Sequence, residues 1–313
     1  MMSRRFAVLC ISAAIALWSC TNDADGQLTD EKAHELAELA ELVQHRRAQI
    51  QTIDLTYTSL VEVAHSQMSA PSNDPNWRAV NMEIVHVKYQ GERFFWESRG
   101  WRDPGRDPSH HFVSTYDGEK SITYNVLART ASIAAKYSAP WPRDRFHSCL
   151  RWSRALEHRN HPRRDLTTLI TRQTCHSLTT GTAQGAETVV LDCGLDKVWL
   201  DVEHGGVLRR IEARRSVDGP LFSRVDVAEV RDIEGVFFPT KIVKLRFVDE
   251  TSAPKRMWNT PVKRLTSTVA EDGLKINCDL TPEDFDVQLP PGTRIIGRPN
   301  RIQRIDEVTS AEP

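Results

Sequence analysis

The sequence contains no excess of charge of one sign, no long apolar segment after its first 20 residues and no internal repeat. Lys and Arg number 41 against 42 Asp and Glu, so the formal net charge is −1. A balance of this kind excludes the basic field that nucleic-acid-binding chains carry, and we expect no nucleic-acid partner. The lack of a second apolar run excludes a membrane-spanning helix in the rest of the chain. The lack of a 20–50-residue period excludes propellers and solenoids.

Motifs of common enzyme classes are also missing. The chain has no G-x-S-x-G elbow, no G-x-x-x-x-G-K-[ST] loop and no H-E-x-x-H pair. His110 and His111 are adjacent, and neighbours on a strand point to opposite faces, which suits no shared metal. His158 and His161 lie among arginines, which disfavour a bound cation. The sequence therefore predicts no enzyme activity, no metal and no cofactor.

The first residues have the features of an export signal. Arg4 and Arg5 precede an uncharged, mostly apolar run from Phe6 to Trp18. A membrane-spanning helix needs about 20 apolar residues, so this run fits the core of a signal peptide better than an anchor. Leu17-Trp18-Ser19-Cys20 resembles the bacterial lipobox, in which the cysteine becomes lipid-modified.

From these features we expect a signal peptide over 1–19, lipidation at Cys20 and a polar tether over 20–28. The protein is then exported to the bacterial cell envelope and faces the periplasm, attached to a membrane by its N-terminal lipid. The alternative is an ordinary signal peptide cleaved next to Cys20, without a lipid.

Four cysteines remain after Cys10 and Cys20: Cys149, Cys175, Cys193 and Cys278. Cys175 and Cys193 flank a Gly-containing stretch, 179–185, that is suited to a hairpin turn. Opposed strands of that hairpin predict a disulfide between these two in an oxidising compartment. Buried free thiols are the alternative.

The hydrophobic pattern predicts a mainly β, α+β fold. Leu36, Leu39, Ala40 and Val43 recur at helical spacing, so we expect a helix over about 29–49. Alternating residues then predict about ten or eleven mostly antiparallel strands, with hairpin turns at Asp117-Gly118 and at 271–273. A helical insertion interrupts them between about 141 and 170. Thr281-Pro282-Glu283-Asp284 predicts one capped helical turn, and 298–313 a loose polar tail.

Aromatic residues lie at alternating strand positions and predict one apolar sheet face. They are Tyr57, Tyr89, Phe94, Trp96 and Phe247. Such a face must be covered. The helical segments could cover it, which gives a closed core, or a ligand's acyl chain could enter, which gives an open cavity.

Several strand and turn signatures resemble a known family. They are Tyr116-Asp117-Gly118, the stretch from Lys197-Val198-Trp199-Leu200-Asp201 through Gly206 to Ile211, Gly235-Val236-Phe237-Phe238-Pro239-Thr240-Lys241-Ile242, and Phe285 followed by Leu289-Pro290-Pro291-Gly292-Thr293. Together they resemble the LolA/LolB-like lipoprotein localisation superfamily, especially outer-membrane-lipoprotein-sorting-like proteins of planctomycete type.

The resemblance implies that 29–297 form an antiparallel half-barrel wrapped around the N-terminal helix and the central helical insertion. Its apolar cavity binds acyl chains or lipoproteins, and the protein is a monomeric carrier or acceptor in lipid or lipoprotein trafficking. The family's soluble carrier is not lipidated, whereas we expect lipidation here, as in the membrane-anchored acceptor. The alternatives are an envelope sensor or interaction module on the same fold and, third, a hydrolase.

Overall fold

The computed structural model describes residues 30–64, 76–103, 105–134, 177–248, 251, 254–296 and 302–304. In this part of the chain hydrogen bonds join the strands in the order β15-β14-β6-β5-β4-β3-β2-β1-β13-β12-β11-β10-β9-β8-β7. The chain divides into two compact units. The first comprises Met1–Gln49, Glu62–Arg78 and Ser148–Thr266, and the second Ile50–Val61, Ala79–His147 and Ser267–Pro313.

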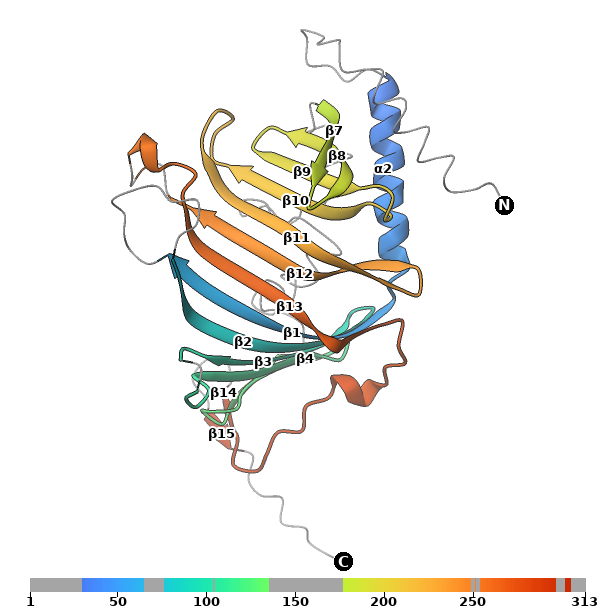
Figure 1. The fold of residues 1–313 in the computed structure, drawn as a ribbon. Coiled ribbons are helices and arrows are strands. Elements are labelled where there is room, and N and C mark those ends of the chain that lie inside the picture. The colour runs from blue at the N-terminus through green and yellow to red at the C-terminus, as the bar shows by residue number, and fades with distance from the viewer. Residues whose placement is uncertain are drawn as a thin grey trace, which may run out of the picture. The chain divides into compact units, whose positions relative to one another are not determined.

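The first unit contains the helix α2 (Asp30–Ala48) and an antiparallel run of strands (Figure 1). The strands are β7 (Ser177–Ala183), β8 (Ala186–Cys193), β9 (Asp196–Asp201), β10 (Val207–Arg214), β11 (Leu221–Ile233) and β12 (Val236–Phe247), followed by the short helix η1 (Lys255–Met257). Each strand pairs with the next one along the chain, because the turns between them are short. The helix expected over 29–49 is thus confirmed to within a residue at each end.

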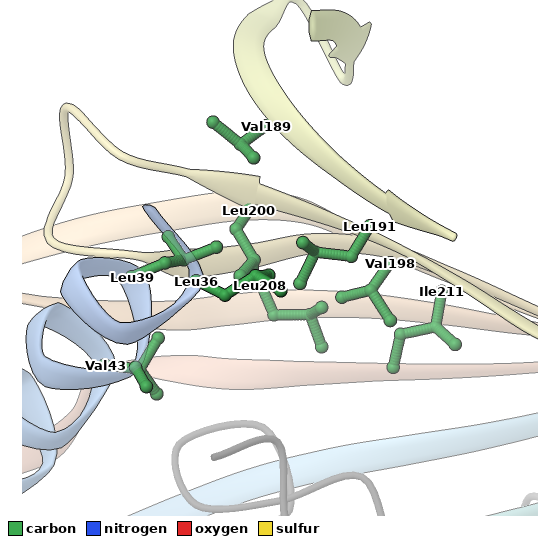
Figure 2. Packing of buried hydrophobic residues seen from close by; sticks show 10 residues of the cluster. Leu36, Leu39, Val43, Val189, Leu191, Val198, Leu200, Leu208 and Ile211 are labelled. Carbon is green, nitrogen blue, oxygen red and sulfur yellow. The ribbon is translucent and has the colours of Figure 1, made fainter. Parts of the chain in front are cut away.

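One face of this run is closed by α2. Leu36, Leu39, Ala40 and Val43 form a stripe on the helix, and all four are buried. They pack against aliphatic side chains of three strands, as Figure 2 shows: Val189, Leu191, Val198, Leu200, Leu208 and Ile211. We call these ten residues the aliphatic cluster. It is the core that the helical period of the sequence predicted.

The second unit is built mainly from hairpins. Its strands are β2 (Trp77–Gln90), β3 (Arg93–Trp101), β4 (His110–Tyr116), β5 (Ser121–Asn125), β6 (Thr130–Ala134), β14 (Arg294–Ile296) and β15 (Ile302–Arg304). The long strands β1 (Thr52–Ala64) and β13 (Pro261–Ile276) contribute residues to both units, and the first two residues of β2, Trp77 and Arg78, belong to the first unit. Pairing is antiparallel from β2 to β6, whereas β14 lies parallel to β6. The predicted hairpin at Asp117-Gly118 joins β4 to β5 as expected.

The chain that leaves β13 crosses one face of the second unit. The helical turn expected at 281–284 is η2 (Pro282–Phe285), with the capping box between Thr281 and Asp284 present. Lys88 on β2 donates to Asp284, and Gln90 donates to the carbonyl of Leu280. Phe285 is fully buried. The segment therefore covers the face of β2 on which Lys88 and Gln90 lie.

The expected number of strands was too low, since fifteen lie in the described residues. Thr130–Ala134, Arg294–Ile296 and Ile302–Arg304 are strands that the alternation did not reveal, because they are only three to five residues long. The last of these lies within the expected tail. The central helical insertion falls outside the described residues.

The turn predicted at 271–273 was also wrong, because β13 runs through it without interruption. Gly273 has a different role. A Cβ there would lie 2.6 Å from the carbonyl oxygen of Thr56, so glycine is needed for the close approach of the neighbouring backbone.

Candidate ligand-binding face

Large apolar side chains meet across β2 and β3 in the second unit. In the antiparallel register Tyr89 lies opposite Phe94, and Val87 opposite Trp96. Side chains directly opposite each other on one face are in contact distance. On β1, Asp54 bonds His86, and strand alternation puts Tyr57 and Tyr89 on the side away from that bond. We call Tyr57, Val85, Val87, Tyr89, Phe94 and Trp96 the aromatic face.

The aromatic face is buried. Tyr57, Tyr89, Phe94 and Trp96 are between 3% and 8% exposed. Lys88 and Gln90 point the opposite way, toward the C-terminal segment, so that segment does not cover the aromatic face. Parts of the chain other than this C-terminal segment therefore bury the aromatic face.

A polar cluster continues the same face toward the end of β3. Ser98 follows Trp96 at the next inward position, lies opposite Val85 on β2 and is completely buried. Its Oγ donates to Glu83 and lies 3.3 Å from Nε2 of His110. Nε2 of His110 is 3.4 Å from Oε1 of Glu83. We call Glu83, Ser98 and His110 the polar end of the face.

Gly100 makes this cluster possible. It pairs with His110 across β3 and β4, and a Cβ at this position would overlap the imidazole ring. The ring occupies the space that a side chain at position 100 would take. Glu83 and His110 are 23% and 25% exposed, so the polar end reaches solvent while the aromatic part does not.

The polar end lacks the geometry of a nucleophilic triad. In such a triad the base accepts the serine proton through one ring nitrogen while an acid orients the other. Here Ser98 donates to Glu83 instead of to the histidine. Nε2 of His110 is the ring nitrogen nearest to both Ser98 and Glu83, so Glu83 does not orient the ring through its other nitrogen. The cluster can exchange hydrogen bonds with a polar group of a ligand.

The other face of the same strands carries hydrogen bonds between histidines and carboxylates. His86 bonds Asp54 at 2.7 Å, and His111 bonds Glu97 at 2.7 Å. His110 and His111 thus lie on opposite faces, as the sequence predicted. Among the described residues no group of three His, Cys, Asp or Glu side chains is arranged to hold a metal. No described helix has the length and apolar character needed to cross a membrane.

Other residues singled out in the sequence have separate positions. Phe247 is buried at the end of β12 in the first unit. Cys193 is disulfide-bonded, but Cys175 lies outside the described residues, so this pairing stays a prediction. Cys278 is a free cysteine. Cys20 also lies outside the described residues.

The sequence reasoning missed the polar end. Ser98 continues the alternation that begins at Phe94 and Trp96, and this was the available signal. Glu83 and His110 belong to other strands, and only the register of β2, β3 and β4 brings them to Ser98.

Comparison with known proteins finds similarity in structure alone. No protein-family model matches the chain, and no curated protein matches its sequence. A DUF1329 family protein from Desulfovibrio piger aligns over 80% of this chain and 97% of its own, with 10% identity and a TM-score of 0.43. A LolA superfamily protein from Nitrosomonas europaea aligns over 82% and 97%, with 11% identity and a TM-score of 0.37.

An uncharacterized conserved protein from Thermus thermophilus aligns over 84% of this chain and 99% of its own, with 7% identity and a TM-score of 0.29. The LolA superfamily, which the sequence motifs resemble, is therefore represented among the solved structures similar to this chain.

Proposed function

We propose that this protein is an envelope lipoprotein that holds acyl chains against the aromatic face of the second unit. It acts as a carrier or acceptor of lipids or lipoproteins in a half-barrel. The observation that carries the proposal is the aromatic face itself. Tyr89 pairs with Phe94, and Val87 with Trp96, to form one continuous apolar surface across adjacent strands.

The chemistry of this face suits an amphiphile. Each methylene removed from water contributes about 0.8 kcal/mol, so a chain lying along the rings gains affinity with its length. The polar end lies beside the apolar part, and His110 and Glu83 are partly exposed there. A ligand with an apolar chain and a polar head therefore matches both parts of the face.

The N-terminal sequence supports the proposed export and membrane attachment of the protein. A basic start, a short apolar run and a lipobox-like Leu17-Trp18-Ser19-Cys20 are typical of exported lipoproteins. Lipid attachment at Cys20 would hold the protein at a membrane that supplies or receives the acyl chains. We expect it to act as a monomer.

A second candidate is an interaction module without lipid cargo. It is favoured by the burial of the aromatic rings, which are already covered in this structure. Under this hypothesis the face is a closed core and partners bind the outer surface.

Native mass spectrometry of the full chain carrying Cys20→Ser, exported in a bacterial host, separates the two candidates. The substitution removes the expected lipidation site. Co-purified lipid that is released on denaturation supports the acyl-chain proposal. A clean protein mass, together with no uptake of a fluorescent fatty acid, would contradict it and favour the interaction module.

Neighbouring phenylalanines provide a matched test of the face. Phe94 lies on the aromatic face, whereas Phe95 points to the other face, where it contacts His86. We expect Phe94→Ala to weaken fatty-acid uptake about tenfold or more and Phe95→Ala to leave it nearly unchanged. Tyr89→Leu, a milder change on the same face, should weaken uptake if Phe94→Ala does not fold. Equal uptake by folded Phe94→Ala and Phe95→Ala would place the ligand elsewhere.

A further inference from the structure

Arg46 is a buried cation whose Nε makes no hydrogen bond. It lies in the last turn of α2 and is 4% exposed. Its Nε is, among the described residues, the one buried side-chain nitrogen or oxygen that makes no hydrogen bond. Buried polar groups in native proteins are almost always hydrogen-bonded, so an unsatisfied one calls for an explanation.

Other arginines of the first unit show the usual solution. Arg209 holds Asp201 through Nε at 2.8 Å and Nη2 at 2.6 Å. Arg264 holds Glu62 through two bonds of 2.7 and 2.9 Å. Two bonds to one carboxylate are a common way to satisfy the N–H groups of a buried or half-buried guanidinium. The Nε of Arg46 makes no such bond.

Burial leaves the guanidinium charged. Desolvation lowers the pKa of Arg46 to about 10, which is still well above neutral pH. The side chain is therefore protonated under physiological conditions. A charge in this position attracts an anion more strongly than one in water would.

The side chain of Arg46 lies against the turn between β9 and β10. A Cβ on Gly205 would lie 3.8 Å from Cδ of Arg46. A Cβ on Gly206 would lie 3.0 Å from a methyl group of Val43 and 3.6 Å from the side chain of Leu42. The surroundings of this turn are therefore largely apolar. Besides Glu203, which is exposed, the turn offers only one carboxylate, that of Asp201.

Asp201 is already fully engaged. Its Oδ2 accepts from Arg209 and lies 2.7 Å from Nδ1 of His204. Its Oδ1 accepts from the backbone N–H of His204 at 3.1 Å. The carboxylate of Asp201 thus bonds the side chains of Arg209 and His204. Arg46 adds a further positive charge beside the turn.

We propose that Arg46 and the turn from Asp201 to Gly206 form a binding site for one anionic group, a carboxylate or a phosphate. The planar guanidinium, which offers several N–H donors, matches the oxygens of either group. The group can belong to a free anion or to the head of a lipid. This site lies in the first unit and does not depend on acyl-chain binding by the aromatic face.

Isothermal titration of the full chain carrying Cys20→Ser with inorganic phosphate and with acetate tests the proposal. The test variant is Arg46→Met, which keeps an unbranched apolar side chain and removes the charge. Arg78→Met is the matched control, since Arg78 is an exposed arginine of the same unit. We expect at least one of the two anions to bind the parent protein and Arg78→Met equally, and Arg46→Met at least tenfold more weakly.

A thermal melt of the same variants gives a second readout. Without an anion, Arg46→Met should melt at the same temperature as its parent or higher, because an unpaired buried charge has been removed. Addition of the anion should raise the melting temperature of the parent but not of Arg46→Met. Arg46→Lys, which keeps the charge, should recover part of the response.

Lipid probes then identify the source of the anion. Dilauroyl phosphatidylglycerol carries an anionic phosphoglycerol headgroup that uncharged dilauroylglycerol lacks. A preference for the phospholipid that Arg46→Met abolishes assigns the site to a headgroup, while binding of the small anions alone assigns it to a free anion. Absence of binding by both anions and of the lipid preference, or an unchanged response in Arg46→Met, would overturn the proposal. A failure of fatty-acid uptake in the Phe94 test leaves it intact.

Discussion

The aliphatic cluster and the aromatic face are built from different kinds of side chain. The aliphatic cluster of the first unit consists of Leu, Ile, Val and Ala, and α2 from the same unit covers it. The aromatic face of the second unit consists of Tyr, Phe, Trp and Val and passes into Glu83, Ser98 and His110. The apolar stripe of one helix can pack closely against a surface of aliphatic side chains and cover it. A surface with a partly exposed polar end matches a ligand that carries both an apolar chain and a polar head, which is why we place acyl-chain binding in the second unit.

Buried charge shows the same contrast. In the first unit Asp201 and Arg209 form a close pair with two bonds to one carboxylate oxygen. In the second unit the polar end is partly exposed, and its imidazole contacts are longer, at 3.3 and 3.4 Å. The first arrangement rigidifies a turn, while the second leaves donors and acceptors that a ligand could use.

Loss of the Asp201 carboxylate should have the largest effect on the first unit. Asp201→Leu leaves Arg209 buried without a counter-charge, so we expect a loss of about 4 kcal/mol in the free energy of unfolding. Urea denaturation followed by circular dichroism measures it. The double variant Asp201→Leu/Arg209→Met should recover most of the loss. A single-variant cost below about 1 kcal/mol would mean that the pair is not an important part of this unit.

Truncation within the aliphatic cluster should cost somewhat less. Leu200 is completely buried, and Leu200→Ala should lower the free energy of unfolding by about 3 kcal/mol, through lost apolar burial and the cavity it leaves. Val217→Ala, at an exposed position, is the control and should change stability by about 0.5 kcal/mol or less. Fatty-acid uptake per folded molecule should be unchanged in both. Reduced uptake by folded Leu200→Ala would link the cluster to the ligand and weaken the contrast drawn above.

The smallest effect is expected where the C-terminal segment meets β2. Lys88 donates to Asp284 and holds the pKa of that carboxyl below its ordinary value. The carboxylate therefore stabilises the fold at pH values above about 4, and this contribution is lost as the pH falls through the lowered pKa. Asp284→Asn also weakens the capping box, and we expect a cost of about 1 kcal/mol at pH 7.

Stability of Asp284→Asn and its parent, measured from pH 7 down to pH 2, tests both parts of this prediction. The difference between the two proteins should shrink below about pH 4, because the parent then loses its charge as well. A difference that stays constant across this range would show that the ionised carboxylate makes no contribution.

Several elements could be predicted because their signals are local. The period of Leu36, Leu39, Ala40 and Val43 predicted α2, and Thr281 to Asp284 predicted the capped turn of η2. The Asp117-Gly118 dipeptide predicted the hairpin between β4 and β5. The opposite orientations of His110 and His111 followed from alternation alone.

Other features depended on residues that are far apart in the sequence. Gly273 was interpreted as part of a turn, because nothing near it reveals the backbone of Thr56 that it faces. Arg46 had the pattern of an ordinary helix residue, and nothing near it in the sequence reveals the turn that lies against its side chain or the unbonded Nε.

The sequence by itself thus determined the helix α2, most of the longer strands, the apolar side of β1 and β3 and the turn at Asp117-Gly118. These properties depend on the conformational preferences of neighbouring residues. The tertiary structure decided which strands pair, in which register, and therefore that Glu83, Ser98 and His110 form one polar end beside the aromatic rings. Register places side chains from distant segments opposite one another, and a shift by one residue would move each of them to the other face.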